Sequence, residues 1–323
     1  MAVIWIDRAF GDLDALGHEL IGPVEDDRHR ADAVVLELAG GTAPGERWAG
    51  WMFDQVPGLR AVALTGGDPV DDRRIDLSEA TRRGIAVIGT ADVAEVARAE
   101  HAVALLLAAA KTLPRHQHRF RTNVGGFGRL STGEEFAGST LGLVGYDGVA
   151  RRVAAVAAAL GMRVIVHDPF VFDPTTSEGH EVVEFDQLLA EADHVSLHVP
   201  AAPDTACLFD GDVLGRCRHG LTLINISAPV LVDHDALRAA LHEGQVGNAG
   251  LDLDPAVLGA DHPLANRDDV VLTPGVAGAT RTTMRRSLQV AVDRVAAALD
   301  GERPPGLLNG DALAGGWDDL EAE

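Results

Sequence analysis

The chain has 323 residues, 46% of them hydrophobic, which is enough for two domains that each bury a core. A formal net charge of −22 at pH 7 disfavours nucleic acid and anionic membranes as partners, because both are negatively charged. The two cysteines provide no disulfide framework, no apolar run reaches about 18 residues, and the first residues lack the pattern of a signal peptide, so we expect a cytoplasmic protein.

Apolar stretches at 2–7, 31–38, 59–67 and 84–91 alternate with polar helical stretches, which predicts a small parallel sheet. The segment Ala99–Leu113 follows, a strong helix former that Pro114 is expected to end. Its residues are apolar nearly all round. We therefore expect this helix to be buried between domains or subunits.

A second strand–helix series follows the polar segment 115–138. Helices are expected between its strands, for example Asp233–Glu243 with Asp233 as N-cap, and a last amphipathic helix is expected at Arg281–Leu299. Such a series is typical of an α/β fold with a doubly wound parallel sheet, which binds ligands at the carboxyl ends of its strands. The predicted strands are Leu141–Gly145, Arg163–Asp168, His194–Val199, Leu221–Ile226, Gly247–Leu253 and Val270–Thr273.

The first of these strands opens a dinucleotide-binding pattern: an apolar strand, a glycine turn, a helix rich in Ala and Val, and a strand that ends in Asp168. A carboxylate at this spacing holds the ribose hydroxyls of NAD. The turn departs from G-x-G-x-x-G/A, because Asp147 takes the middle glycine's place between Gly145 and Gly148. Two interpretations stay open. Either Asp147 caps the following helix, or its charge repels the pyrophosphate and makes NAD binding doubtful.

Phrases along nearly the whole chain resemble the D-2-hydroxyacid dehydrogenase family, among them AEHAVALLLAAAK, FAGSTLGLVG, GMRVIVHDP, ADHVSLHVPAAPDT and VVLTPGVAGAT. The resemblance implies two Rossmann-like domains with a cleft between them. A smaller flavodoxin-like domain would comprise 1–98 and 290–323, and a dinucleotide-binding-type domain 99–289. It also implies a homodimer formed through the helices near Ala99–Leu113, a small-molecule ligand and NAD(P). If a dinucleotide binds, the residues assigned to it are Gly145, Gly148, Asp168, Pro200, Asn225 and Asp252.

The family transfers a hydride with an arginine that pairs with the substrate carboxylate, a histidine that acts as acid and base, and a glutamate that tunes the imidazole. Aligning the phrases puts Ala228 at the arginine position and Gly275 at the histidine position. Ala256 falls at the glutamate position, in a phrase one residue shorter than the family's. The resemblance therefore implies a divergent member that lacks all three catalytic side chains.

Four polar residues near predicted strand ends are candidates for substitute chemistry: Tyr146, Asp147, Ser227 and His198. Tyr146 is the only tyrosine, and its simplest interpretation is a partly exposed loop aromatic. His198 is more often structural than catalytic in such a phrase, and His101 is interpreted as a packing or interface residue. Neither a nucleophile motif nor metal-ligand spacing is evident, so no metal is expected.

Three functions remain in view. Loss of the catalytic side chains with an orderly core favours a repurposed enzyme that acts on a small molecule without redox chemistry. A non-catalytic pseudoenzyme that binds a metabolite or a protein partner is the second. The third is an oxidoreductase that keeps NAD(P)H and acts on a 2-oxo or 2-hydroxy acid-like substrate with substitute residues.

Overall fold

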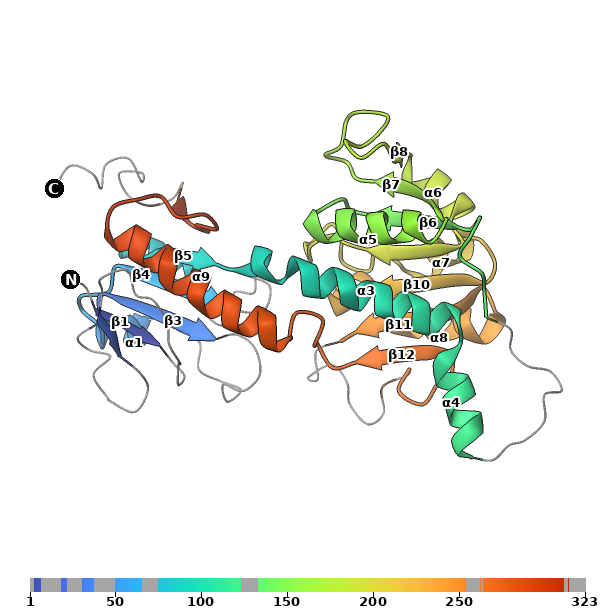
Figure 1. Ribbon diagram of the computed structural model, residues 1–323, viewed down its shortest axis with the longest axis horizontal. Coiled ribbons are helices and arrows are strands. Elements are labelled where there is room, and N and C mark those ends of the chain that lie inside the picture. The colour runs from blue at the N-terminus through green and yellow to red at the C-terminus, as the bar shows by residue number, and fades with distance from the viewer. Residues whose placement is uncertain are drawn as a thin grey trace. The chain divides into compact units, whose positions relative to one another are not determined.

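The computed structural model describes residues 3–6, 19–21, 31–37, 50–65, 75–122, 133–253, 262, 264–310 and 313. The chain divides into two compact units, one made of Met1–Glu95 with Gly278–Glu323 and the other of Val96–Ala277 (Figure 1). The bounds expected from sequence were 98/99 and 289/290. The second of these would divide a single helix, whereas the unit boundary falls in the turn before that helix begins at Arg281.

The first unit contains a five-stranded sheet in which each pair of neighbouring strands is parallel, in the order β2-β1-β3-β4-β5. This is the flavodoxin-like order that the family resemblance implies. Strand β2 was not predicted, because its three residues are too short to give a periodic signal. The strands are β1 (Val3–Ile6), β2 (Glu19–Ile21), β3 (Ala33–Glu37), β4 (Ala61–Thr65) and β5 (Ala86–Gly89).

Helix α9 (Arg281–Leu299) joins the second chain end to this first sheet, where it packs on β3, β4 and β5 (Figure 1). Its buried Ala291, Val292 and Val295 share one core cluster with Val35, Ala63 and other strand residues. The shared core explains why the first unit is discontinuous in sequence. The other helices here are α1 (Gly50–Asp54), α2 (Leu77–Arg82) and the 3-10 turn η2 (Ala91–Ala94).

The second unit contains a seven-stranded, all-parallel sheet in the order β12-β11-β10-β9-β6-β7-β8. The chain runs outward from β6 through β7 and β8, then returns to the other side of β6 with β9. The order reverses there, so β6 and β9 flank the topological switch point of a doubly wound sheet. The strands are β6 (Thr140–Val144), β7 (Arg163–His167), β8 (Glu181–Val182), β9 (His194–Leu197), β10 (Leu221–Asn225), β11 (Val246–Asp252) and β12 (Val270–Thr273).

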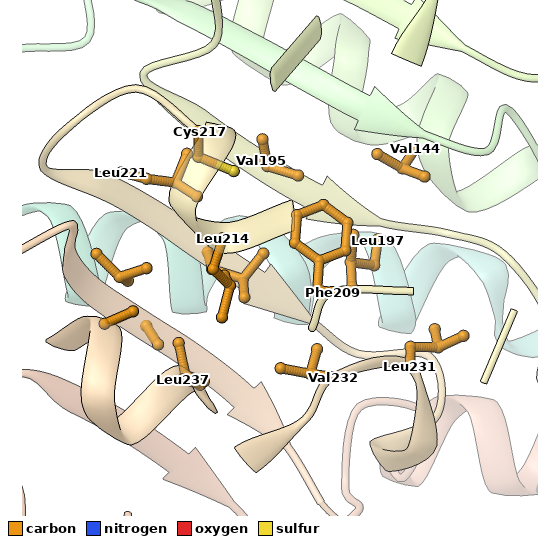
Figure 2. Close-up of a cluster of buried hydrophobic side chains, with 14 of the residues drawn as sticks. Val144, Val195, Leu197, Phe209, Leu214, Cys217, Leu221, Leu231, Val232 and Leu237 are labelled. Carbon is orange, nitrogen blue, oxygen red and sulfur yellow. The ribbon is translucent and has the colours of Figure 1, made fainter. Parts of the chain in front are cut away.

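Helices cover both faces of this sheet. Residues of α3 (Glu95–Ala110) and α5 (Gly148–Ala159) form one buried cluster with β6 and β7. On the other face, α6 (Phe185–Glu191), α7 (Gly211–Arg216) and α8 (His234–Glu243) form a second cluster. Figure 2 shows the centre of this second cluster, where Phe209 and Leu197 lie among leucines and valines from several elements. The α/β prediction of doubly wound parallel sheets is confirmed.

One helical prediction needs correction. Helix α3 ends at Ala110 rather than at Pro114, and Thr112 then takes a left-handed backbone with a φ of 52°. Pro114 instead lies in the first turn of α4 (Leu113–Arg121), where its missing N–H costs nothing. A proline that starts a helix therefore looked, in sequence, like one that ends the previous helix. Across the described ranges, no helix is both long and apolar enough to cross a membrane.

Candidate functional site

The candidate site lies at the carboxyl ends of the seven-stranded sheet, where doubly wound sheets bind their ligands. Every predicted site residue in the described part of the chain lies close in sequence to one of these strand ends. Ala256 falls outside the described residues. No set of three or more His, Cys, Asp or Glu side chains is placed to hold a metal within the described ranges.

Gly145 follows β6 and has a φ of +88°, a conformation that favours glycine. A Cβ at this position would lie 2.5 Å from the backbone oxygen of His198, at the end of β9. Its N–H donates to the oxygen of His167, 2.9 Å away on β7. The turn is thus locked between the neighbouring strands, and it requires glycine whether or not a cofactor binds.

Asp147 is the N-cap of α5. Its Oδ1 accepts a hydrogen bond from the N–H of Ala150 at 2.8 Å, and the residue is exposed. The structure therefore supports the capping interpretation of this aspartate. The same bond keeps the negative charge at the helix N-terminus, where a pyrophosphate would be held. The N–H groups of Gly148 and Val149 have no partner within the helix and remain for a phosphate.

Asp168 directly follows β7 and is half-buried. Its Oδ2 accepts from the N–H of Tyr146 at 2.8 Å, and its Oδ1 accepts from the N–H of Phe170 at 2.9 Å. Because a carboxylate oxygen has two acceptor positions, each oxygen keeps one for a further donor. The carboxylate is thus fixed beside the glycine turn with acceptor capacity to spare.

Tyr146 is buried, not partly exposed as its simplest interpretation required. Its hydroxyl donates to Oε2 of Glu178 at 2.8 Å, and the guanidinium of Arg151 lies over its ring. Burial and the adjacent Glu178 carboxylate raise the pKa of Tyr146, although a Thr176 hydrogen bond opposes them. These contacts tie the loop after β7 to the turn and make the hydroxyl a poor acid.

His198 is buried at the end of β9, with its Nε2 2.9 Å from Oγ of Ser196. Burial lowers the pKa of His198 to about 4, although the negative charge of Asp147 opposes the shift. The imidazole is therefore neutral near pH 7. A buried, neutral side chain paired with a serine is a structural element rather than a proton donor.

The turn after β10 uses its own polar groups to hold its shape. The Asn225 side chain donates to the oxygen of Ala228 at 2.8 Å and accepts from the N–H of Ser227 at 2.9 Å. The Ser227 hydroxyl donates to the oxygen of Leu197 at 2.9 Å. Ala228 itself is half-buried and carries no group that could pair with a carboxylate. Pro200, beyond β9, is exposed.

Asp252, at the end of β11, is a second anchored carboxylate. Its Oδ1 accepts from Oγ1 of Thr273 at 2.5 Å and from the N–H of Val276 at 2.9 Å. Its Oδ2 accepts from the N–H of Ala277 at 2.7 Å. These bonds shape the loop after β12, in which Gly275 is exposed with a φ of +68°.

Sequence reasoning missed His101, which it interpreted as a packing or interface residue. Its Nε2 lies 2.9 Å from Oγ1 of Thr273 and 3.8 Å from Oδ1 of Asp252, and its side chain is 20% exposed. No local motif links a residue on α3 to the ends of β11 and β12, since 172 positions separate His101 from Thr273. The register of β11 and β12 pairs Asp252 with Thr273, and the position of α3 brings His101 to Thr273.

Residues 103–277 match the family description "D-isomer specific 2-hydroxyacid dehydrogenase, NAD binding domain". A D-3-phosphoglycerate dehydrogenase from Mycobacterium leprae is 36% identical over 282 residues, which cover 87% of this chain and 52% of that protein. A glyoxylate reductase from Korarchaeum cryptofilum is 35% identical over 263 residues, which cover 80% of this chain and 78% of that protein. The TT0316 protein from Thermus thermophilus superposes with a TM-score of 0.79 at 31% identity, covering 95% of this chain and 99% of that one.

The chain belongs to the D-isomer-specific 2-hydroxyacid dehydrogenase family. It spans about half the length of the phosphoglycerate dehydrogenase that it matches. The relatives are dehydrogenases and reductases, which supports an enzyme. The prediction of a non-redox enzyme is wrong, because these matches favour the NAD-dependent alternative over both it and a pseudoenzyme.

The residues present fit the ribose end of NAD(H) well. Asp168 offers two fixed acceptor oxygens. They lie beside a turn in which the positive φ of residue 145 favours glycine, so no side chain projects there. The fit at the pyrophosphate is poorer, because the Asp147 carboxylate occupies one N–H of the helix N-terminus. The match to an NAD binding domain supports NAD(H) as the ligand, so this charge is better understood as tuning affinity than as excluding the cofactor.

Proposed function

We propose that the protein is an NAD(H)-dependent oxidoreductase that interconverts a small 2-oxo acid and the corresponding 2-hydroxy acid. The observation that carries the proposal is the Asp168 carboxylate, held at the end of β7 by two backbone N–H groups within the segment that matches an NAD binding domain. The names of the relatives, phosphoglycerate dehydrogenase and glyoxylate reductase, support this substrate class.

NADH, when bound, supplies the hydride that reduces a carbonyl carbon. The chain's own contribution begins with Asp168, whose spare acceptor positions suit the two ribose hydroxyls. The same negative charge opposes a 2′-phosphate, so the site favours NADH over NADPH. The anchored Asp252 fixes the loop after β12, which borders the reacting end of the site in this proposal.

We further propose that the reaction proceeds without the arginine, glutamate and histidine that the family uses. Ala228 and Gly275 bear no charge and no proton donor, so neither can clamp a carboxylate or act as an acid. Tyr146, Ser227 and His198 already serve structural hydrogen bonds. Substitute residues must therefore carry the proton.

Fluorescence titration with NADH and NADPH tests the cofactor, and loss of NADH absorbance with glyoxylate or another 2-oxo acid tests the reaction. We expect micromolar NADH affinity and at least about tenfold weaker NADPH binding, equivalent to about 1.4 kcal/mol. Absence of NADH binding at millimolar concentration would overturn the proposal. Equal affinity for the two cofactors would overturn the role given to Asp168.

We also infer a homodimer formed through α3. Val103 and Leu107 of this helix are only partly buried against the unit's own core, and Ala104 is exposed. Light scattering coupled to size exclusion tests this directly, with a mass of two chains expected. Elution at the mass of one chain across micromolar concentrations would contradict it.

A further inference from the structure

Three side chains from separate elements form a hydrogen-bonded chain at the ends of β11 and β12. The buried Asp252 carboxylate is bonded to Oγ1 of Thr273 at 2.5 Å, and the same oxygen of Thr273 lies 2.9 Å from Nε2 of His101. The His101 ring is part-buried, and its Nε2 is 3.8 Å from Oδ1 of Asp252. The chain ends on the imidazole.

The geometry fixes which nitrogen carries the proton. The Thr273 hydroxyl has a single hydrogen, and a carboxylate oxygen 2.5 Å away, with no proton of its own, must receive it. The Thr273 oxygen can then offer His101 only a lone pair, so Nε2 of His101 must be the donor. In the neutral ring the proton therefore lies on Nε2, and Nδ1 is left as the atom that gains or loses a proton.

We propose that His101 is the acid and base of the reaction, with Thr273 and Asp252 as positioning residues. The inference rests on the proposed oxidoreductase function. In the reducing direction, Nδ1–H of the imidazolium gives its proton to the substrate carbonyl oxygen, while the carbonyl carbon receives the hydride that the proposed cofactor supplies. The product is the hydroxy acid, the ring is left neutral, and solvent returns the proton to Nδ1.

Location supports this role. Thr273 precedes Gly275 by two residues, so the His101 ring is held at the strand end where the family pattern places an imidazole. The Asp252 carboxylate, from β11, lies 3.8 Å from Nε2 of the ring. The Asp252 charge, relayed through the Thr273 hydroxyl, stabilises the imidazolium that the acid step requires.

Other imidazoles at this edge are less suitable. His198 is buried and bonded to Ser196, and burial lowers its pKa to about 4, so it has no proton to give near pH 7. His167 makes its Nδ1 contact with the backbone oxygen of Val183 at 3.0 Å, on the side of β7 away from β10. His101 alone among these three combines a fixed tautomer with a part-exposed ring.

Kinetics of His101→Gln test the proposal, because glutamine keeps a donor toward Thr273 but cannot carry a proton. We expect kcat to fall at least about 100-fold, the magnitude of lost acid–base catalysis, with NADH affinity within threefold of wild type. His118→Gln is the matched control, since that histidine is exposed on α4 of the same unit. Unchanged kcat in His101→Gln, with NADH bound, would overturn the inference and leave the oxidoreductase proposal standing.

Variants of Thr273 show whether its hydroxyl links His101 to Asp252 or whether the side chain only fills space. Thr273→Val removes the hydroxyl at nearly constant volume and is expected to shift the alkaline limb of the kcat profile for the reducing direction to lower pH, because the imidazolium that this direction requires loses its link to Asp252. Thr273→Ser keeps the hydroxyl and is expected to restore the wild-type profile. Identical profiles for the valine and serine variants would contradict the relay.

Imidazole ¹⁵N NMR gives a readout that does not depend on turnover. The His101 signals, assigned by their loss in His101→Gln, are expected to show the Nε2–H tautomer and to move when NADH and oxamate are added together. Oxamate is the probe because it presents a carboxylate and a carbonyl but is not reduced. An Nδ1–H tautomer, or signals that stay in place with both ligands bound, would overturn the proposal even in the absence of a known substrate. Failure of NADH itself to bind would instead refute the proposed function.

Discussion

Two regions along the carboxyl ends of the seven-stranded sheet differ in what holds their functional groups. We call the ends of β6 and β7 the first edge and the ends of β10 to β12 the second edge. At the β6–β7 edge, the Gly145 turn is fixed by backbone geometry, and the Asp168 carboxylate accepts from two backbone N–H groups. At the β10–β12 edge, side chains bond to one another, as in the chain from His101 through Thr273 to Asp252. Backbone requirements of the fold preserve the first edge. Side chains at the second can be exchanged without disturbing the sheet, and Ala228 and Gly275 lie there.

The largest expected effect tests whether backbone geometry fixes the glycine turn of the first edge. Gly145→Ala adds a Cβ at a φ of +88° and places it 2.5 Å from the oxygen of His198. We expect the free energy of unfolding to fall by about 3–5 kcal/mol, from the left-handed backbone and the forced shift of β9 together. Urea denaturation followed by circular dichroism measures this change.

Gly179→Ala is the matched control, because Gly179 has a φ of +87° but an added Cβ there would meet no atom within 4 Å. It should lose only the backbone part, about 1–2 kcal/mol. Equal losses in the two variants would show that the close approach of β9 contributes nothing. The turn would then not be locked by its neighbour.

The second prediction concerns β9, the strand between the two edges. Burial lowers the pKa of both His194 and His198 to about 4 from the ordinary 6.5. Below pH 6.5 the unfolded chain takes up these protons and the folded chain does not, so stability present above pH 6.5 is lost as the pH falls toward 4. The loss is up to about 3 kcal/mol for each histidine.

Urea midpoints at pH 7.5, 5.5 and 4.5 measure this dependence. His194→Leu is expected to reduce it, and also to keep or raise stability at pH 7.5, because neither ring nitrogen of His194 has a partner among the described residues. A variant with the wild-type pH dependence would show that His194 does not titrate differently on unfolding.

The same contrast explains what the sequence could and could not reveal. Strands β6, β7 and β9 to β12 and helix α9 follow from apolar periodicity, whereas the two-residue β8 was not predicted. Asp233 is the N-cap of α8, as its residue type and position predict. The capping role of Asp147 was one of two interpretations, and only its 2.8 Å bond to Ala150 favours it. These are local features, which residue type and spacing can predict.

Contacts between elements that are distant in the sequence could not be predicted from it. Burial of Tyr146 depends on Glu178 in a loop 32 residues away, and the position of His101 depends on Thr273. The phrase alignment that puts Ala228 and Gly275 at the family's catalytic positions predicts non-redox chemistry, whereas the overall match favours an NAD-dependent enzyme.

Asp168→Asn tests the first edge as a cofactor site. The amide keeps one acceptor oxygen but loses the charge and turns N–H donors toward the Tyr146 or Phe170 N–H group. We expect NADH affinity to fall about 30-fold, close to 2 kcal/mol, as charge-assisted hydrogen bonds are lost. NADPH affinity should fall less, so the preference between the cofactors narrows. Parallel fluorescence titrations of both cofactors check this, and an unchanged preference would place the ribose elsewhere.

The smallest expected effect concerns Asp147, which takes the place of the middle glycine in the turn of the first edge. Asn is as good an N-cap as Asp, so Asp147→Asn should leave the unfolding midpoint nearly unchanged. Removing the negative charge beside the helix N-terminus should tighten NADH binding about tenfold, equivalent to about 1.4 kcal/mol. The gain should shrink as salt is raised from about 20 to about 500 mM, because exposed charges are screened. If affinity and its salt dependence both match wild type, Asp147 acts only as a cap, and the first edge differs from the family pattern in sequence but not in function.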